Sequence, residues 1–158
     1  MAEDLNIQKG TKQEQYESLI PQIEGLLHGE PNLIANLANI SAALKEQFNF
    51  WWVGFYWVQD TELVLGPFQG PVACTRIKKG RGVCGGAWEN GTTLIVEDVE
   101  KFPGHIACSS ASKSEIVVPV YFGETIVGVL DVDSEHLAHF DETDKLFLEK
   151  IVGLIPNN

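Results

Sequence analysis

The middle of the chain consists of short apolar runs separated by turn-forming residues. These runs are bounded by Gly, Pro, Asn and Asp, which is typical of strands joined by turns. Gly123-Glu124 separates the last two runs and predicts a tight hairpin. We therefore expect strands over residues 51–58, 62–66, 72–76, 92–97, 115–122 and 125–132.

Three flanking stretches repeat apolar residues every three or four positions, which indicates helices that bury one face. The first covers 13–27, where Pro21 predicts a kink or a break. The second is predicted to begin at Pro31, because proline suits a first helical position. It places Ile34 and Ala38 on its apolar stripe. The third follows Asp141, a helix N-cap with a carboxylate at the third helical position. Helices at both ends of a mostly antiparallel sheet predict an α+β fold, with the helices packed on one face.

Length and charge limit the possible functions. At 158 residues the chain suits one domain, which we expect to span 1–158 with its core at about 11–155. A net charge of −11 repels phosphate backbones and anionic lipids, so we expect neither nucleic acid nor membrane as a partner. The N-terminus shows no signal peptide, and no apolar run is long enough to span a membrane. A cytoplasmic location is expected.

The three cysteines are candidates for chemistry, because a reducing compartment disfavours permanent disulfides. Cys84 follows Gly80-Arg81-Gly82-Val83, and a thiol near a helix N-terminus and an arginine has a lowered pKa. Cys108 lies among small polar residues typical of an exposed loop, whereas Cys74 follows two apolar residues at a predicted strand end. Buried, inert thiols are the alternative. A zinc site from Cys74, Cys84, His105 and Cys108 is a weaker one, because the paired spacing of zinc modules is missing.

Acidic residues gather at the ends of two predicted strands. Asp131 and Asp133 are two positions apart and point to one face if the strand continues, which favours a cationic ligand such as an ammonium group. Glu115 begins the preceding strand, and the hairpin brings it beside this pair. A carboxyl group held against apolar walls and like charge keeps its proton to higher pH and can act as an acid. Carboxylates that merely end strands are the alternative.

Aromatic residues alternate along the first predicted strand. Period two places Trp52, Gly54 and Tyr56 on one face, and places Trp51, Val53, Phe55 and Trp57 on the other. A glycine between two large rings suggests the wall of a small pocket that holds a methyl group or a polarised sulfur. Ordinary core packing is the alternative.

Five motifs together resemble the free methionine-R-sulfoxide reductase family, a catalytic branch of the GAF-domain fold. They are Trp-Trp-Val-Gly-Phe-Tyr at 51–56, Leu-Gly-Pro-Phe-Gln-Gly at 65–70, Gly-Arg-Gly-Val-Cys-Gly at 80–85, the segment 104–115, and Gly-Val-Leu-Asp-Val-Asp-Ser at 128–134. The resemblance covers almost the whole chain. It implies a single GAF-like domain that reduces free L-methionine (R)-S-oxide to L-methionine.

The resemblance also implies residue roles. Cys108 would attack the sulfoxide sulfur, and Cys84 or Cys74 would resolve the resulting sulfenic acid as a disulfide. Asp131 and Asp133 would hold the substrate ammonium and, with Glu115, the protonated oxygen, while Trp52 and Tyr56 would line the pocket for the methyl group and side chain.

Several expectations about partners follow from the same resemblance. Thioredoxin would recycle the disulfide, and a homodimer is expected, without metal or cofactor. A small-ligand sensor remains the alternative, since GAF-type folds also serve as binding modules. A metal-stabilised interaction domain is a third reading.

Overall fold

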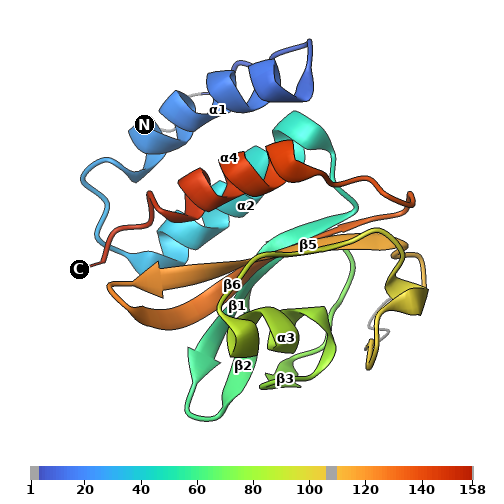
Figure 1. Cartoon of the computed structure of the whole chain (residues 1–158). Coiled ribbons are helices and arrows are strands. Elements are labelled where there is room, and N and C mark those ends of the chain that lie inside the picture. The colour runs from blue at the N-terminus through green and yellow to red at the C-terminus, as the bar shows by residue number, and fades with distance from the viewer. Residues whose placement is uncertain (1–3, 106–109, 158) are drawn as a thin grey trace.

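Within residues 4–105 and 110–157, which the computed structural model describes, the chain forms a six-stranded antiparallel sheet with helices on both faces (Figure 1). The sheet order is β3-β2-β1-β6-β5-β4. The elements follow one another as α1 (Lys12–Leu27), α2 (Leu33–Phe48), β1 (Trp52–Gln59), β2 (Glu62–Gln69), β3 (Arg76–Lys78), α3 (Gly82–Asn90), β4 (Leu94–Val96), a 3-10 helix (Val99–Lys101), β5 (Ser114–Phe122), β6 (Thr125–Ser134) and α4 (Glu142–Val152).

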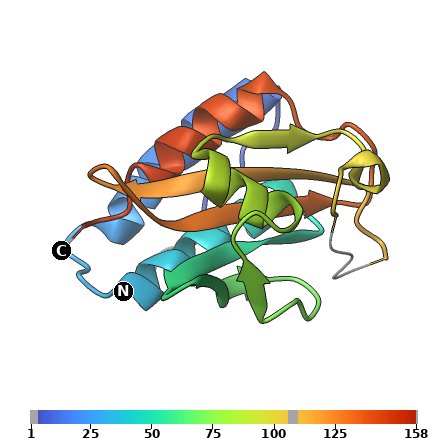
Figure 2. The ribbon, with the colours of Figure 1, turned by 60° about the horizontal axis from the view of Figure 1, so that its bottom comes forward.

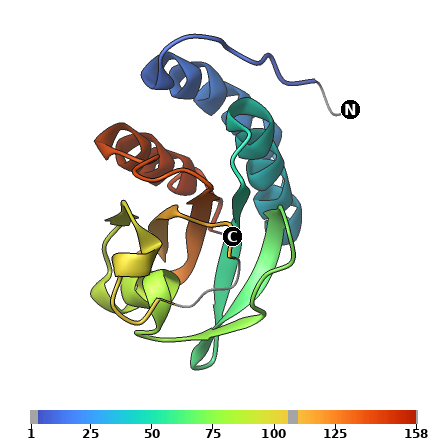
Figure 3. The same cartoon turned by 90° about the vertical axis from the view of Figure 1, so that its right-hand side faces the viewer.

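Helices α1, α2 and α4 cover one face of the sheet, and α3 lies on the other (Figures 1 and 3). Apolar residues of the three helices pack with Val53 and Phe55 of β1 and with the matching faces of β5 and β6. Helix α3 lies against the opposite face of the sheet (Figure 2). A second apolar cluster joins residues of α3 to that face. The predicted α+β fold, with terminal helices on one face, is confirmed. No helix within the described residues is long and apolar enough to cross a membrane.

The two N-terminal helices differ from their predictions. Helix α1 continues through Pro21, so the predicted break is wrong. Pro21 is exposed, and water can bond the carbonyl that its missing N–H leaves free. Helix α2 begins after Pro31, because the Asn32 side chain accepts a hydrogen bond from the Ala35 amide and caps it. Ile34 is 68% exposed and Ala38 is exposed as well, so neither belongs to the buried stripe.

A buried polar network joins the first and last helices. Asp141 caps α4 and forms the predicted capping box with Asp144. The Asp144 carboxylate accepts a hydrogen bond of 2.6 Å from the Tyr16 hydroxyl and pairs with Lys12 at 2.6 Å. Burial, followed by the charge of Asp144, raises the pKa of Tyr16, so the phenol stays a donor. The Asp144 carboxylate therefore completes the capping box of α4 and also fixes that helix to α1.

Close contact between β1 and β2 depends on a glycine. A Cβ atom added at Gly54 would lie 2.2 Å from the Phe68 Cβ and 2.7 Å from its Cα. The Phe68 Cα belongs to the backbone of the paired strand, and the Cβ is bonded to it. Neither atom can move away unless the strand itself moves. The glycine of β1 thus permits the side chain of β2 to pack directly against it.

We expect Gly54→Ala to destabilise the fold by about 1–3 kcal/mol, because the added methyl overpacks the β1–β2 contact. Gly25→Ala is the matched control, since a Cβ at Gly25 in α1 has nothing within 4 Å. That variant should gain up to about 1 kcal/mol from helix propensity. Urea unfolding of both variants measures the difference, and equal midpoints would contradict the close contact.

Candidate active site

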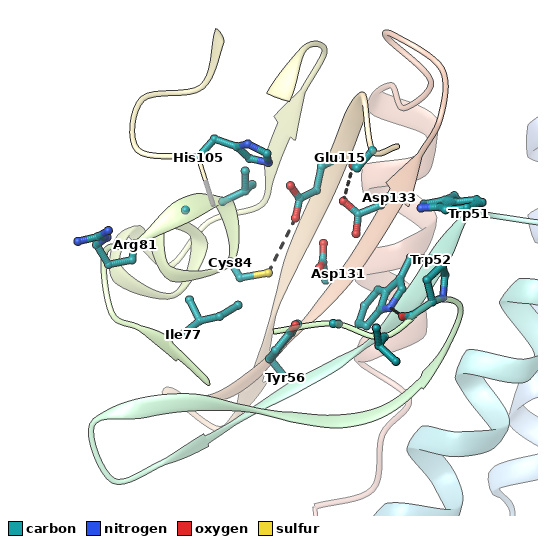
Figure 4. A pocket seen from close by; sticks show the side chains of 16 residues that line it. Trp51, Trp52, Tyr56, Ile77, Arg81, Cys84, His105, Glu115, Asp131 and Asp133 are labelled. Atoms are coloured by element: carbon teal, nitrogen blue, oxygen red, sulfur yellow. Dashed lines mark hydrogen bonds between the residues drawn. The ribbon is translucent and has the colours of Figure 1, made fainter. Parts of the chain in front are cut away.

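A cavity opens on the α3 side of the sheet, where β1, β5 and β6 lie side by side (Figure 4). It offers about 60 Å³ to the centres of water-sized molecules. One water needs roughly 10–15 Å³ on that measure, so several waters or one compact ligand fit. The first turn of α3 and residues 71–73 complete its wall.

Three carboxyl groups meet on the cavity wall, as the strand pattern predicted. Glu115 of β5 pairs with Asp133 of β6, and Asp131 pairs with Gly54 of β1. Because Asp131 and Asp133 are two positions apart on β6, both side chains point to the same face. The predicted juxtaposition of Glu115, Asp131 and Asp133 is confirmed (Figure 4).

Burial controls the charge of this cluster. Burial raises the pKa of Glu115, of Asp131 and of Asp133, and the neighbouring charge of Asp131 raises the pKa of the other two further. Asp133 Oδ1 accepts a hydrogen bond of 2.9 Å from the Ser112 hydroxyl. Among the described residues, Asp131 Oδ1 is buried without a hydrogen-bond partner. The cluster can therefore supply protons and bind a cation.

Cys84 lies in the first turn of α3 and faces the carboxyl cluster. Its thiol donates a long hydrogen bond of 3.9 Å to Glu115 Oε1. Burial, and then the charges of Asp131 and Glu115, raise the pKa of Cys84 well above its usual value. The lowered pKa expected from the helix N-terminus and Arg81 is wrong, because desolvation and nearby negative charge outweigh both.

Cys74 lies in a loop, not in a strand. The predicted strand 72–76 is wrong, since β3 begins at Arg76 and Val72 is 90% exposed. Cys74 is disulfide-bonded, whereas Cys84 is a free thiol. Cys108, the predicted nucleophile, lies outside the described residues.

Known proteins share the fold and much of the sequence of this chain. The profile of the GAF domain matches residues 34–156. The free methionine-R-sulfoxide reductase of Escherichia coli (strain K12) is 46% identical over 90% of this chain and 87% of its own length. The chain belongs to the free methionine-R-sulfoxide reductase family. Its members are oxidoreductases built on a GAF domain.

Two further proteins are similar to nearly the whole chain. GAF domain-containing protein A of Dictyostelium discoideum is 70% identical over 99% of this chain and 100% of its own length. The crystal structure of the Neisseria meningitidis free methionine-R-sulfoxide reductase with its substrate has a TM-score of 0.94 and 53% identity, and the match covers 96% of this chain and 92% of that one.

Aromatic side chains form the apolar wall of the cavity in this reductase-family chain. Trp52 and Tyr56 both line it, as predicted, with ring centroids 6.0 Å apart. The predicted gap at Gly54 is filled by Phe68, whose ring stacks on Trp52 at 5.1 Å. Trp51 also lines the cavity, although alternation placed it on the other face, because β1 begins only at Trp52.

The same two aromatic residues hold the Cys74 loop in place. The Trp52 indole N–H donates to the Pro71 carbonyl at 3.0 Å, and the Tyr56 hydroxyl donates to the Cys74 carbonyl at 2.8 Å. Burial raises the pKa of Tyr56, followed by the charge of Asp131, so the phenol remains a donor. Sequence alternation placed these rings in the pocket but gave no sign of the bonds, which join residues 18 and 19 positions apart.

Ser112 and Trp51 are two residues of the site that the sequence pattern did not indicate. Ser112 lies in a polar run whose composition suggests only a loop, although it hydrogen-bonds Asp133. Cys74 is not available for the zinc site that the sequence suggested, because it is disulfide-bonded. His105, from that set, does line the cavity. Within the described residues, Cys84, Glu115 and Asp131 are the group close enough to share a metal ion.

Proposed function

We propose that this protein reduces free L-methionine (R)-S-oxide to L-methionine in the cytoplasm, with thiols as the source of electrons. The buried cluster of Glu115, Asp131 and Asp133 beside an aromatic wall is the observation that carries the proposal. A sulfoxide gives up its oxygen only when that oxygen receives protons, and a free amino acid brings an ammonium group. The cavity provides groups for both. Membership of the reductase family supports the same reaction.

Substrate binding follows from the charges and surfaces of the cavity. Asp131 Oδ1 is buried without a partner and suits the substrate ammonium, together with Asp133, which Ser112 orients. The flat rings of Trp52 and Tyr56 suit the methyl group and the polarised sulfur. A methionine sulfoxide inside a peptide lacks the free ammonium, so it would leave Asp131 unpaired. Selectivity for the free amino acid follows.

The proposed chemistry begins with the Cys108 thiolate, which attacks the sulfoxide sulfur. Glu115 protonates the oxygen, the S–O bond of the substrate breaks as the hydroxyl passes to the Cys108 sulfur, and methionine leaves with Cys108 as a sulfenic acid. The raised pKa of Glu115 suits this role, because the carboxyl group keeps its proton at pH values where an ordinary glutamate has lost it. The sulfenic acid then condenses with a second thiol, which releases water and forms a disulfide.

Cys74 suits the resolving role better than Cys84. Cys74 is disulfide-bonded, and its loop is held by Trp52 and Tyr56, whereas Cys84 is a buried free thiol with a raised pKa. Thiol exchange with a dithiol protein such as thioredoxin would restore both cysteines. Thioredoxin and a homodimer remain predictions.

Racemic free methionine sulfoxide tests the proposal. We expect incubation with the protein and a dithiol to consume the R diastereomer alone, as chiral chromatography of both forms would show. A peptide that contains methionine sulfoxide is the matched control and should not react. Binding of the amino acid without loss of either diastereomer would contradict the enzyme and support a sensor.

A further inference from the structure

Three side chains from three different elements converge at the inner end of the cavity. Cys84 comes from α3, Glu115 from β5 and Asp131 from β6 (Figure 4). One sulfur and two carboxylate oxygens all lie within 4.8 Å of one another. The exposed fractions are 4% for Cys84, 6% for Glu115 and 6% for Asp131, so surrounding water competes little for them.

Asp131 supplies independent evidence that a cation belongs here. Its Oδ1 atom is buried and has no hydrogen-bond partner among the described residues. A buried oxygen without a partner carries a desolvation cost of about 1–3 kcal/mol, which a ligand can recover. Because Asp131 lines the cavity, a ligand that enters can reach its side chain. An ammonium group is one such ligand, but an ammonium would gain little from the adjacent sulfur.

We propose that Cys84, Glu115 and Asp131 form a binding site for a divalent cation that favours thiolate ligands, such as Zn²⁺. Zn²⁺ binds thiolate at about 2.3 Å and carboxylate oxygen at about 2.1 Å, so a tetrahedral site separates sulfur from oxygen by about 3.6 Å. The Cys84 sulfur and Glu115 Oε1 are already 3.9 Å apart. Small side-chain rotations would therefore complete three ligands, with the fourth position open to the cavity.

The ligand types select the cation. Mg²⁺ and Ca²⁺ prefer six or more oxygen ligands and gain little from sulfur. Borderline and soft cations gain most from a thiolate, so Zn²⁺ and Co²⁺ fit this set. Binding releases the Cys84 thiol proton and the proton that Glu115 carries to solvent, as the thiolate and the carboxylate coordinate the metal.

A bound cation would block the proposed reaction. It would occupy Asp131, which we assign to the substrate ammonium, and Glu115, which we assign to oxygen protonation. Zn²⁺ should therefore compete with the sulfoxide, raising its apparent KM without changing kcat. This consequence rests on the proposed function, whereas metal binding itself does not.

Cobalt spectroscopy on the full chain tests the site. The Cys74→Ser/Cys108→Ser variant leaves Cys84 as the single thiol, because the chain has three cysteines. With a phosphine as reductant, we expect one equivalent of Co²⁺ to give a thiolate charge-transfer band in the near ultraviolet, and one equivalent of Zn²⁺ to remove it. Adding Cys84→Ser should abolish the band, and adding Asp131→Asn should weaken Zn²⁺ binding at least about tenfold.

A control variant distinguishes metal binding at this site from binding to carboxylates on the acidic surface. Glu62→Gln removes a carboxylate that pairs with Arg76 and does not line the cavity, and it should leave the band and the affinity unchanged. Circular dichroism checks that each variant is folded. Absence of a thiolate band, or equal Zn²⁺ affinity with and without Cys84, would overturn the proposal. Thiolate-dependent Zn²⁺ binding in a protein that does not reduce the sulfoxide would refute the proposed function and leave this site standing.

Discussion

Cys108→Ser is expected to eliminate methionine release, both in steady state and in a single turnover. Loss of a nucleophile that works with an acid costs about 10⁴–10⁶-fold in kcat, because the remaining groups cannot form the covalent link to sulfur. Rapid quench of stoichiometric enzyme with the R-sulfoxide, followed by chromatography of methionine, measures the loss. One equivalent of methionine from the Cys108→Ser protein would contradict the assignment.

The other cysteines provide the matched comparison. Cys74→Ser should release about one equivalent of methionine per chain and then stop, because its sulfenic acid lacks the resolving thiol. With thioredoxin supplied as the reductant of the disulfide, Cys84→Ser should release more than one, since Cys84 is a free thiol and Cys74 is disulfide-bonded. A reversal of the two results would make Cys84 the resolving cysteine.

Glu115→Gln is expected to lower kcat by about 10²–10⁴-fold, the usual contribution of a general acid. Glutamine keeps the shape of the side chain but cannot give a proton to the sulfoxide oxygen. In the unmodified protein, kcat should fall as pH rises through the raised pKa of Glu115, because the protonated form is the active one. That fall should be absent from the pH profile of the variant. A variant with unchanged kcat would assign the acid elsewhere.

The same substitution should stabilise the fold at high pH. The pKa of Glu115 is raised by burial, so between its unfolded and folded pKa values the folded chain binds more protons than the unfolded chain. Stability then falls as pH rises through that window. Glutamine carries no charge to desolvate, so Tm of the variant should exceed that of the parent at alkaline pH. The gain should vanish below about pH 4, where both forms are neutral. A lower Tm for the variant at alkaline pH would contradict this explanation.

Several features could be predicted because they depend on residues that are close together in the sequence. The two-residue spacing of Asp131 and Asp133, the hairpin at Gly123 and the cap at Asp141 each depend on neighbours in the sequence. Together they led to the α+β fold and to the carboxyl cluster with Glu115. The alternation of Trp52 and Tyr56 gave the aromatic wall in the same way.

Tertiary structure decided everything that depends on burial or on contacts between distant segments. Helix α1 tolerates Pro21 because that residue faces solvent, and Phe68 fills the space at Gly54. The local motif around Cys84 suggested a reactive thiolate, yet packing against Asp131 and Glu115 raises its pKa instead. The periodicity of a sequence determines which faces of its helices and strands are apolar. Desolvation and charge interactions between side chains arise only when elements remote in the sequence pack together. By itself the sequence determined the fold class and the three carboxyl groups and two aromatic rings that line the cavity; the folded structure decided the protonation of those carboxyl groups and placed Cys84 beside them.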